Sequence, residues 1–140
     1  MLANRSVPPC TVIPVLSYPD VGAAAEWLCG AFGFAVRLRI GNHRIQLKAG
    51  DGCIILAEGL AEGSVVAGGA HLVMVRVPDA VGHHERARKH GAIILAPPTD
   101  YPFGERQYRA QDFVGHRWTF TQTIADMAPE EWGGTAVALE

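Results

Sequence analysis

The clearest alternation of polar and apolar side chains lies near the end of the chain. Residues 116–121 read H-R-W-T-F-T, and such alternation is typical of a strand with one buried face. Residues 112–115, D-F-V-G, precede it. They supply an Asp that can hydrogen-bond its own backbone and a Gly that tolerates positive φ. We therefore predict a hairpin whose arms are residues 105–111 and 116–121.

Two helices are indicated by apolar positions at a helical period and by their end signals. The first covers residues 21–32, with Asp20 as its N-cap and Gly33 as its end. The second follows Asp79 and stops at Gly91. Short apolar runs between turn residues predict the remaining strands. These strands are residues 11–18 (an edge position, because of Pro14), 35–40, 44–48, 53–57, 71–77 and 92–95, and residues 97–103, with three prolines, are expected to be a loop.

The order of these elements repeats after about 60 residues. Pro-Asp begins both helices, glycine ends both, and Gly52 and Gly115 precede the last strand of each half. Such self-similarity indicates one supersecondary unit used twice. We expect one α+β domain in which two tandem βαβββ modules form a curled eight-stranded sheet around a cleft, with helices on the outside. The modules are about residues 11–58 and 71–123, joined by a Gly/Ala/Ser-rich linker at 59–70 and followed by a C-terminal tail at 124–140.

The paired βαβββ order, the two Pro-Asp helix starts and the D-x-x-G-x-x-W-x-F hairpin together resemble the vicinal oxygen chelate superfamily. That superfamily includes glyoxalases, extradiol dioxygenases and bleomycin resistance proteins. The resemblance covers about residues 11–123 and implies a divalent metal in the enzymes, with ligands on the first and last strands of each module. The corresponding positions here are Ile13, Leu56, Leu72 and Thr119. Aliphatic side chains cannot ligate and a threonine hydroxyl is a poor ligand, so we expect neither a metal nor another cofactor.

Composition narrows the partners and the compartment. The net charge of -2 argues against nucleic acid, and no apolar run reaches the roughly 18 residues needed to span a bilayer. The N-terminus lacks the apolar core of a secretory signal. Cys10, Cys29 and Cys53 are odd in number and lack C-x-x-C spacing, which favours free thiols in a reducing, cytoplasmic compartment. The six histidines form no metal-binding motif, and no nucleophile elbow or phosphate-binding loop is present.

Strand alternation predicts the side chains that line the cleft. If the aromatic side chains of the last strand pack beneath a helix, the polar ones on the same strand face the cleft. The alignment of Gly52 with Gly115 extends this assignment to the first module. The expected ligand-binding residues are Gln46, Ile54, Leu56, Met74, Arg76, Gln107, Arg109, Arg117 and Thr119. For the arginines, the alternative is that they extend from strand ends into water.

These observations favour a metal-independent small-molecule-binding protein, with a drug or an aromatic metabolite as ligand. Two alternatives stay open: a metal-dependent lyase, isomerase or dioxygenase of the glyoxalase type, and a structural or regulatory dimer without ligand. A homodimer is expected from the resemblance. It is also expected because Met127 and Trp132 of the C-terminal tail need a surface on which to bury.

Overall fold

The computed structural model describes residues 2–61, 63–66 and 69–138. The first module contains β1 (Val15–Ser17), α1 (Val21–Phe32), β2 (Ala35–Ile40), β3 (Arg44–Ala49) and β4 (Gly52–Ala57). The second contains β5 (Val73–Arg76), α2 (Ala80–Lys89), β6 (Ile93–Tyr101), β7 (Glu105–Gln111) and β8 (Arg117–Thr123). A short 3-10 turn, Pro129–Trp132, lies in the C-terminal tail. The predicted βαβββ repetition is confirmed.

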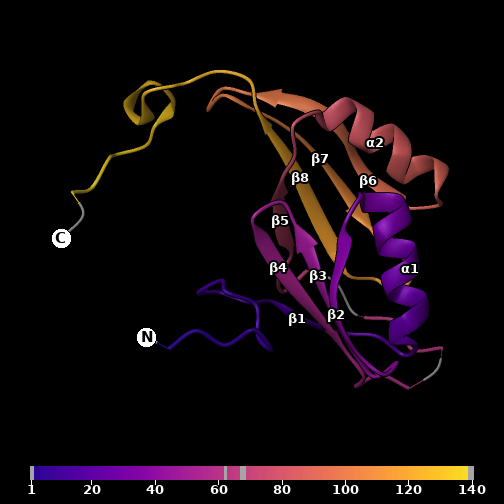
Figure 1. Ribbon diagram of the computed structural model, residues 1–140. Coiled ribbons are helices and arrows are strands. Elements are labelled where there is room, and N and C mark those ends of the chain that lie inside the picture. The colour runs from indigo at the N-terminus through magenta and orange to yellow at the C-terminus, as the bar shows by residue number, and fades with distance from the viewer. Residues whose placement is uncertain (1, 62, 67–68, 139–140) are drawn as a thin grey trace.

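The eight strands form two hydrogen-bonded sheets of four. Their orders are β1-β4-β3-β2 and β5-β8-β7-β6, and in each sheet the first strand pairs in parallel with the last strand of its module. No strand of one sheet is hydrogen-bonded to a strand of the other in the described residues. Together the two sheets curl around one side of the molecule. The two helices lie beside each other on the opposite side, and both termini extend from the sheet side (Figure 1). No helix among the described residues is long and apolar enough to cross a membrane.

The helix ends follow the predicted caps. Asp20 Oδ1 accepts a hydrogen bond from the Ala23 amide at 3.0 Å, and Gly33 ends α1 with φ of 76°. Asp79 Oδ1 accepts from the Gly82 amide at 3.1 Å at the start of α2. Each carboxylate satisfies an amide that has no partner within the helix, so the start of each helix was readable locally.

Two strand predictions were wrong in extent. Residues 97–101 continue β6 instead of forming a loop, although Pro97 and Pro98 lie within the strand. β6 is an edge strand with register shifts beside the prolines, so the missing N–H groups interrupt no inner ladder. The first strand is limited to Val15–Ser17, because the chain before it contains Pro14, whose nitrogen cannot donate. The Pro14 carbonyl still accepts from the Ile55 amide of β4 at 2.9 Å.

Both modules contribute to one hydrophobic core. The ring of Phe32, at the end of α1, packs against Trp118 and Phe120 of β8, with centroid separations of 5.4 and 4.7 Å. Trp118 and Phe120 are fully buried. Because Phe32 at the end of α1 packs against the last strand of the second module, the two modules share their apolar core.

A buried carboxylate also joins the modules. Asp112 is fully buried and accepts from the backbone amides of Val114, Gly115 and His116 at 3.0–3.1 Å. Its other oxygen accepts from the Tyr18 hydroxyl at 2.6 Å and from Trp118 Nε1 at 3.3 Å. Burial, together with the adjacent Asp112 charge, raises the pKa of Tyr18 far above its ordinary value, so the phenol remains a donor. The turn Asp thus closes its own hairpin and binds the first module.

The helices are linked by a half-buried histidine on α2. His83 Nε2 donates to the Phe32 carbonyl at 2.8 Å, and its Nδ1 lies at hydrogen-bonding distance from the Tyr108 hydroxyl. The pKa of His83 is lowered, mainly by burial and further by the nearby Arg86 charge. The neutral ring satisfies both contacts, with Nε2 as donor and Nδ1 as acceptor.

Candidate functional site

The second sheet has one face against the core and one face free of helices, which we call its open face. In the register of β8 with its neighbours, Met74 and Arg109 both lie opposite Thr119. Arg76 and Gln107 both lie opposite the next residue of the same parity, Thr121. Since alternate residues of a strand point to opposite faces and the residues between them are in the core, these side chains share the open face. The structure therefore brings together Met74, Arg76, Gln107, Arg109 and Thr119, as the alternation predicted.

The polar groups on this face are partly paired and partly free. Gln107 Nε2 donates to Thr121 Oγ1 at 3.1 Å, and the Thr121 hydroxyl donates to Glu105 Oε1 at 2.7 Å. Burial raises the pKa of Glu105, but hydrogen bonds from Thr123 and Thr121 and the Arg76 charge outweigh it and hold that pKa below its usual value. Glu105 is thus an ionised acceptor at neutral pH, used by its own sheet.

The two arginines of this face are exposed. Neither Arg76 nor Arg109 forms a salt bridge within the described part of the chain. Met74, with 57% of its surface exposed, lies next to Arg76 on the edge strand β5, and Arg109 lies on β7 with Thr119 of β8 between it and Met74. The open face therefore offers two guanidinium groups without salt bridges, one of them next to a flexible apolar side chain.

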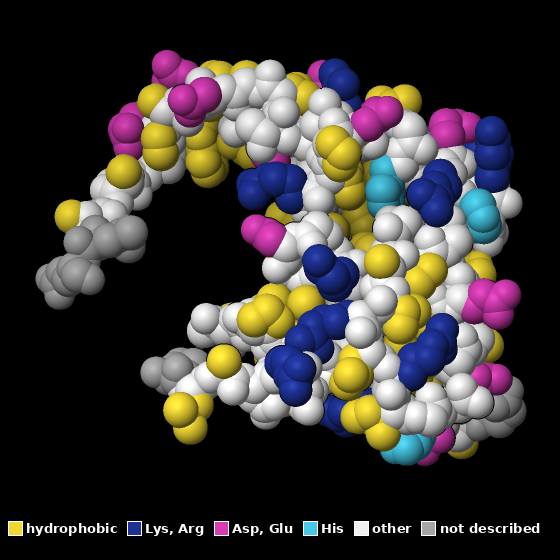
Figure 2. Space-filling view, in the orientation of Figure 1, with side chains coloured by type: hydrophobic (Ala, Val, Ile, Leu, Met, Phe, Trp, Pro, Cys, Tyr) yellow, Lys and Arg dark blue, Asp and Glu magenta, His cyan; other side chains and the backbone are white. Residues whose placement is uncertain are grey.

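A hollow of about 480 Å³ adjoins this face. It lies between β5 and the turn that connects β3 and β4, and includes Val12 and Pro14 from the segment before β1. Lys and Arg side chains gather along the hollowed side of the molecule, between the two terminal segments (Figure 2). The volume is in the range of small-molecule sites. Met74 and Arg76 are the predicted open-face residues that line it.

Two residues predicted for the cleft occupy another place. Leu56 and Ile54 are buried in the core, in register with Ile45 and Leu47 on β3. Ile54 also borders the hollow, but its side chain belongs to the core. The alignment through Gly52 and Gly115 was wrong by one residue, because the two hairpin turns differ in length. A slip of one residue in a strand moves every side chain to the other face. The residue equivalent to Thr119 is Ile55, which also cannot ligate a metal.

Gln46 lies on the open face of the first sheet, but only 3% of its surface is exposed. The segment of residues 2–10, which we call the N-terminal arm, crosses this face. Gln46 Nε2 donates to the Ser6 carbonyl at 2.9 Å and its Oε1 accepts from Arg37 Nη1. The first sheet therefore presents its polar side chains to the chain itself.

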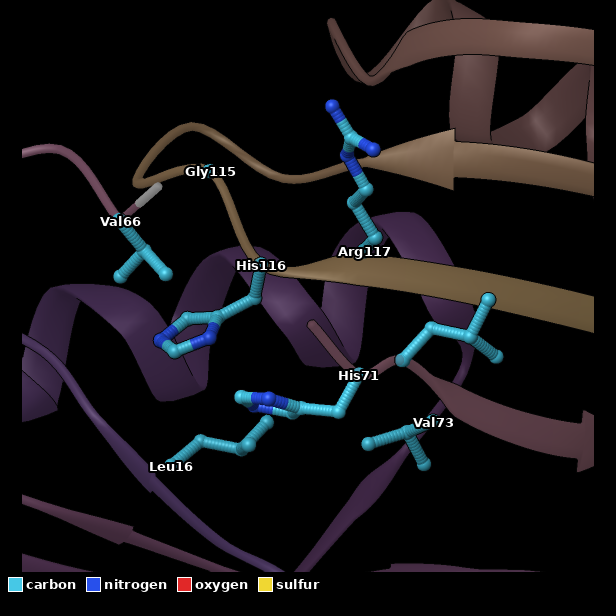
Figure 3. A pocket seen from close by; sticks show the side chains of 8 residues that line it. Leu16, Val66, His71, Val73, Gly115, His116 and Arg117 are labelled. Atoms are coloured by element: carbon cyan, nitrogen blue, oxygen red, sulfur yellow. The ribbon is translucent and has the colours of Figure 1, made fainter. Parts of the chain in front are cut away.

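Arg117 lies at the joint between the modules, beside a small cavity. The cavity has a volume of about 10 Å³, room for a single water molecule and too little for a ligand. His71, His116 and Leu16 surround it, while the Arg117 guanidinium extends away from the two histidines (Figure 3). His116 Nε2 donates to the Ser17 carbonyl at 2.7 Å, so this histidine is a structural link between modules.

Two residues of the two open faces were missed by the sequence analysis. Glu105 lies on the open face of the second sheet beside Thr121, which the alternation had already placed there, and extending the alternation along the hairpin would have found Glu105. Arg37 could not have been found in this way. A register shift between Val36 and Leu38 interrupts the alternation of β2 at its position.

A model of the glyoxalase/bleomycin resistance protein/dioxygenase superfamily matches residues 11–120. The chain belongs to this superfamily. Comparison with curated protein sequences found no match.

Several solved structures are similar to this superfamily member. The structure of TioX from Micromonospora sp. ML1 is 33% identical, covers 85% of this chain and 100% of its own, and has a TM-score of 0.68. A glyoxalase-related enzyme from Fulvimarina pelagi is 19% identical over 93% of this chain and 99% of its own, with a TM-score of 0.66. A lactoylglutathione lyase from Agrobacterium tumefaciens is 16% identical over 82% and 94%, with a TM-score of 0.60. The last two show the fold alone.

The side chains of this superfamily member do not fit the metal that its enzymes use. Across residues 2–61, 63–66 and 69–138, no three His, Cys, Asp or Glu side chains come close enough to hold an ion. The implied ligand positions are occupied by aliphatic residues and by Thr119. This is true whether Leu56 or Ile55 is taken as the position in the first module. Divalent cations are held by imidazole, thiolate or carboxylate groups, so the side chains at these positions cannot coordinate such an ion.

Proposed function

We propose that this protein binds a small molecule without a metal, on the open face of the second sheet and in the adjoining hollow. The observation that carries the proposal is the pair of exposed arginines, Arg76 next to Met74 on β5 and Arg109 on β7, neither of which forms a salt bridge within the described residues. Arg76 also lines the hollow together with Met74 and other apolar side chains, a position that an arginine does not need for solubility alone. A ligand site needs this combination of apolar area and a few oriented polar groups.

The chemistry of the face favours an anionic, planar ligand, such as an acidic aromatic drug or metabolite. Guanidinium groups bind carboxylates through charge-assisted, often bidentate hydrogen bonds and also stack on aromatic rings. Met74 can adapt to an irregular apolar surface. The Thr119 hydroxyl makes no hydrogen bond to another described residue and can donate to or accept from the ligand.

The test is a thermal-shift screen of aromatic carboxylic acids and peptide antibiotics, followed by calorimetric titration of any hit. Arg76→Ala and Arg109→Ala should each weaken binding by about 1.5–3 kcal/mol, roughly tenfold to a hundredfold, because each removes a charged donor. Thr119→Val should weaken it less, since it removes one neutral hydrogen bond.

The matched control is Arg106→Ala. Arg106 lies on the same strand as Arg109 but points to the other face, where its Nε donates to Asp100 at 2.6 Å. This variant should bind as the parent does. A hit whose affinity is unchanged in Arg76→Ala, Arg109→Ala and Thr119→Val would show that the ligand binds elsewhere.

Metal independence has a separate test. Protein purified without chelators should contain far less than one equivalent of Zn, Fe, Mn or Ni per chain by elemental analysis, because the ligand positions lack donors. A value near one equivalent would contradict the proposal and the strand register used here.

We also propose that the protein acts as a homodimer. Val12 and Val15 on the hollowed side are exposed at 80% and 51%, and Trp132 in the C-terminal tail at 44%. Exposed apolar groups of this size commonly mark an interface, and most soluble oligomers pair identical chains. A partner that covers these residues would also narrow the hollow.

A further inference from the structure

The N-terminal arm is held on the first sheet through its main chain. Arg37 Nη2 donates to the Arg5 carbonyl at 3.1 Å and to the Val7 carbonyl at 3.4 Å. Gln46 Nε2 donates to the Ser6 carbonyl at 2.9 Å. Two side chains of the sheet thus donate hydrogen bonds to three successive carbonyl groups of the arm.

The two receiving side chains also orient each other. Arg37 Nη1 donates to Gln46 Oε1, which leaves the Gln46 amide N–H groups directed toward the arm. Arg37 and Gln46 therefore form a pre-positioned set of donors. These donors bind main-chain carbonyl groups, which every peptide has, so they do not select for particular side chains.

Apart from Cys10, whose Sγ donates to the Asp51 carbonyl at 3.6 Å, the side chains of the arm contribute little to its attachment. The side chains of Arg5, Ser6 and Val7 are exposed, and within the described residues 2–9 only Pro8 is buried. The arm forms no strand with the sheet, and its turn is closed locally by Ser6 N donating to Asn4 Oδ1 at 3.0 Å. A segment with few buried apolar contacts opens at low free energy, so this attachment is suited to exchange.

The second sheet shows what the same face is like without an arm. Arg109 and Thr119 pair across their strands as Gln46 and Ile55 do. Arg109 is exposed, whereas only 3% of the Gln46 surface is exposed. Ile55 and Thr119 are both buried, with 7% and 5% exposed, so the two faces differ at the Gln46 and Arg109 position. The arm accordingly fills one of two related half-sites and leaves the other open.

We propose that the open face of the first sheet is a binding site for peptide main chain, centred on Arg37 and Gln46, which the protein fills with its own N-terminal arm. A peptide that offers successive carbonyl groups exchanges with the arm at this site. The inference goes beyond the proposed function because it concerns the other sheet. A ligand of the second sheet depends on Arg76 and Arg109, so either proposal can fail while the other holds.

The first experiment separates the arm from its receiving site. Pro8→Ser weakens the apolar anchor of the arm and leaves Arg37 and Gln46 in place. The probe is a fluorescein-labelled peptide amide with the arm sequence from Asn4 to Pro9, N-R-S-V-P-P, followed by fluorescence anisotropy. Pro8→Ser should bind it about tenfold more tightly than the parent, because an internal competitor lowers apparent affinity in proportion to its occupancy. Adding Arg37→Ala to Pro8→Ser should abolish this gain.

The second experiment reads the position of the arm in the full chain. The Cys53 thiol on β4 is 6% exposed, and burial together with the neighbouring Cys10 of the arm raises its pKa, whereas Cys29 lies on α1. The ratio of Cys53 to Cys29 alkylation by iodoacetamide, measured by mass spectrometry, reports opening of the arm with an internal reference. Arg37→Ala and Gln46→Ala should raise this ratio several-fold. Arg88→Ala should leave it unchanged, because Arg88 lies on α2, where its Nη2 donates to Glu85 Oε2 at 3.1 Å, and its charge acts on neither thiol.

The results that overturn the proposal are equally specific. A peptide that binds neither the parent nor Pro8→Ser at millimolar concentration would show that the face is not a peptide site. Equal binding to Pro8→Ser with and without Arg37→Ala would place the site elsewhere. If Pro8→Ser fails to fold, Gln46→Ala is compared with Arg88→Ala. Equal alkylation ratios in these two variants would show that the arm does not exchange and is a fixed part of the domain.

Discussion

Removing the hydroxyl of Tyr18 tests how the two modules are held together. In Tyr18→Phe the ring still fills its fully buried position, but the 2.6 Å hydrogen bond to Asp112 Oδ2 is lost. That oxygen then keeps only Trp118 Nε1, at 3.3 Å. Because a buried carboxylate loses its shortest contact outside the hairpin, we expect a loss of about 1.5–3 kcal/mol in the free energy of unfolding. For a domain of this size the melting temperature should fall by about 5–12 °C.

The measurement is urea unfolding followed by tryptophan fluorescence, with thermal unfolding as a second probe. Tyr101→Phe is the matched control, since Tyr101 is 38% exposed and should lose less than about 0.5 kcal/mol. A double-mutant cycle with Asp112→Ala isolates the pair: Tyr18→Phe should cost much less when Asp112 is already absent. A loss below about 0.5 kcal/mol for Tyr18→Phe, or the same loss in both backgrounds, would refute the role assigned to this bond.

Three further predictions follow from the packing. The pKa of His83 is lowered from 6.5 by burial, so the unfolded chain takes up a proton first and stability falls as pH drops below about 6.5. His83→Gln should flatten this part of the curve of unfolding free energy against pH, and an unchanged slope would assign it to other groups. Gly104 has φ of +86° and an added Cβ would lie 2.3 Å from the Ala125 carbonyl oxygen. Gly104→Ala should therefore lose more than about 2 kcal/mol. Gly50→Ala should lose only the stability that corresponds to the strain of an alanine at positive φ, because nothing lies within 4 Å of its added Cβ. Equal losses of unfolding free energy in the two variants would show that the structure around Gly104 relaxes to accept the methyl group. In sedimentation equilibrium at tens of micromolar, we expect a species of twice the 15.0 kDa chain mass, and a monomer would count against the proposed dimer.

Much of the fold was readable from local signals. The caps at Asp20 and Asp79 and the hairpin before Trp118 depend on interactions within a few residues, and the structure has them where the sequence predicted. The alternation along β7 and β8 also placed the side chains of the second sheet on the correct faces. In each instance the residue and its partner are close in sequence, so the local sequence pattern is enough to predict their arrangement.

Other features depended on contacts distant in sequence. Ile54 was assigned to the wrong face because two turns of different length shifted the register by one residue. Pro97 lies in a strand because its strand happens to be at the sheet edge. These outcomes are decided by which strands pair, and no local pattern contains that information.

The sequence by itself determined the repeated βαβββ order, the helix ends and the absence of metal-binding side chains at the implied ligand positions, because each depends on residue type and short spacing. The tertiary structure alone decided which half of the cleft is open. Gln46 and Arg109 occupy related places, yet the N-terminal arm buries the first through Ser6 and leaves the second exposed. The arm lies 40 residues from Gln46 along the chain, and it is bound through carbonyl groups that every residue has. A contact made by main chain leaves no trace in the side-chain pattern, so only the folded molecule reveals it.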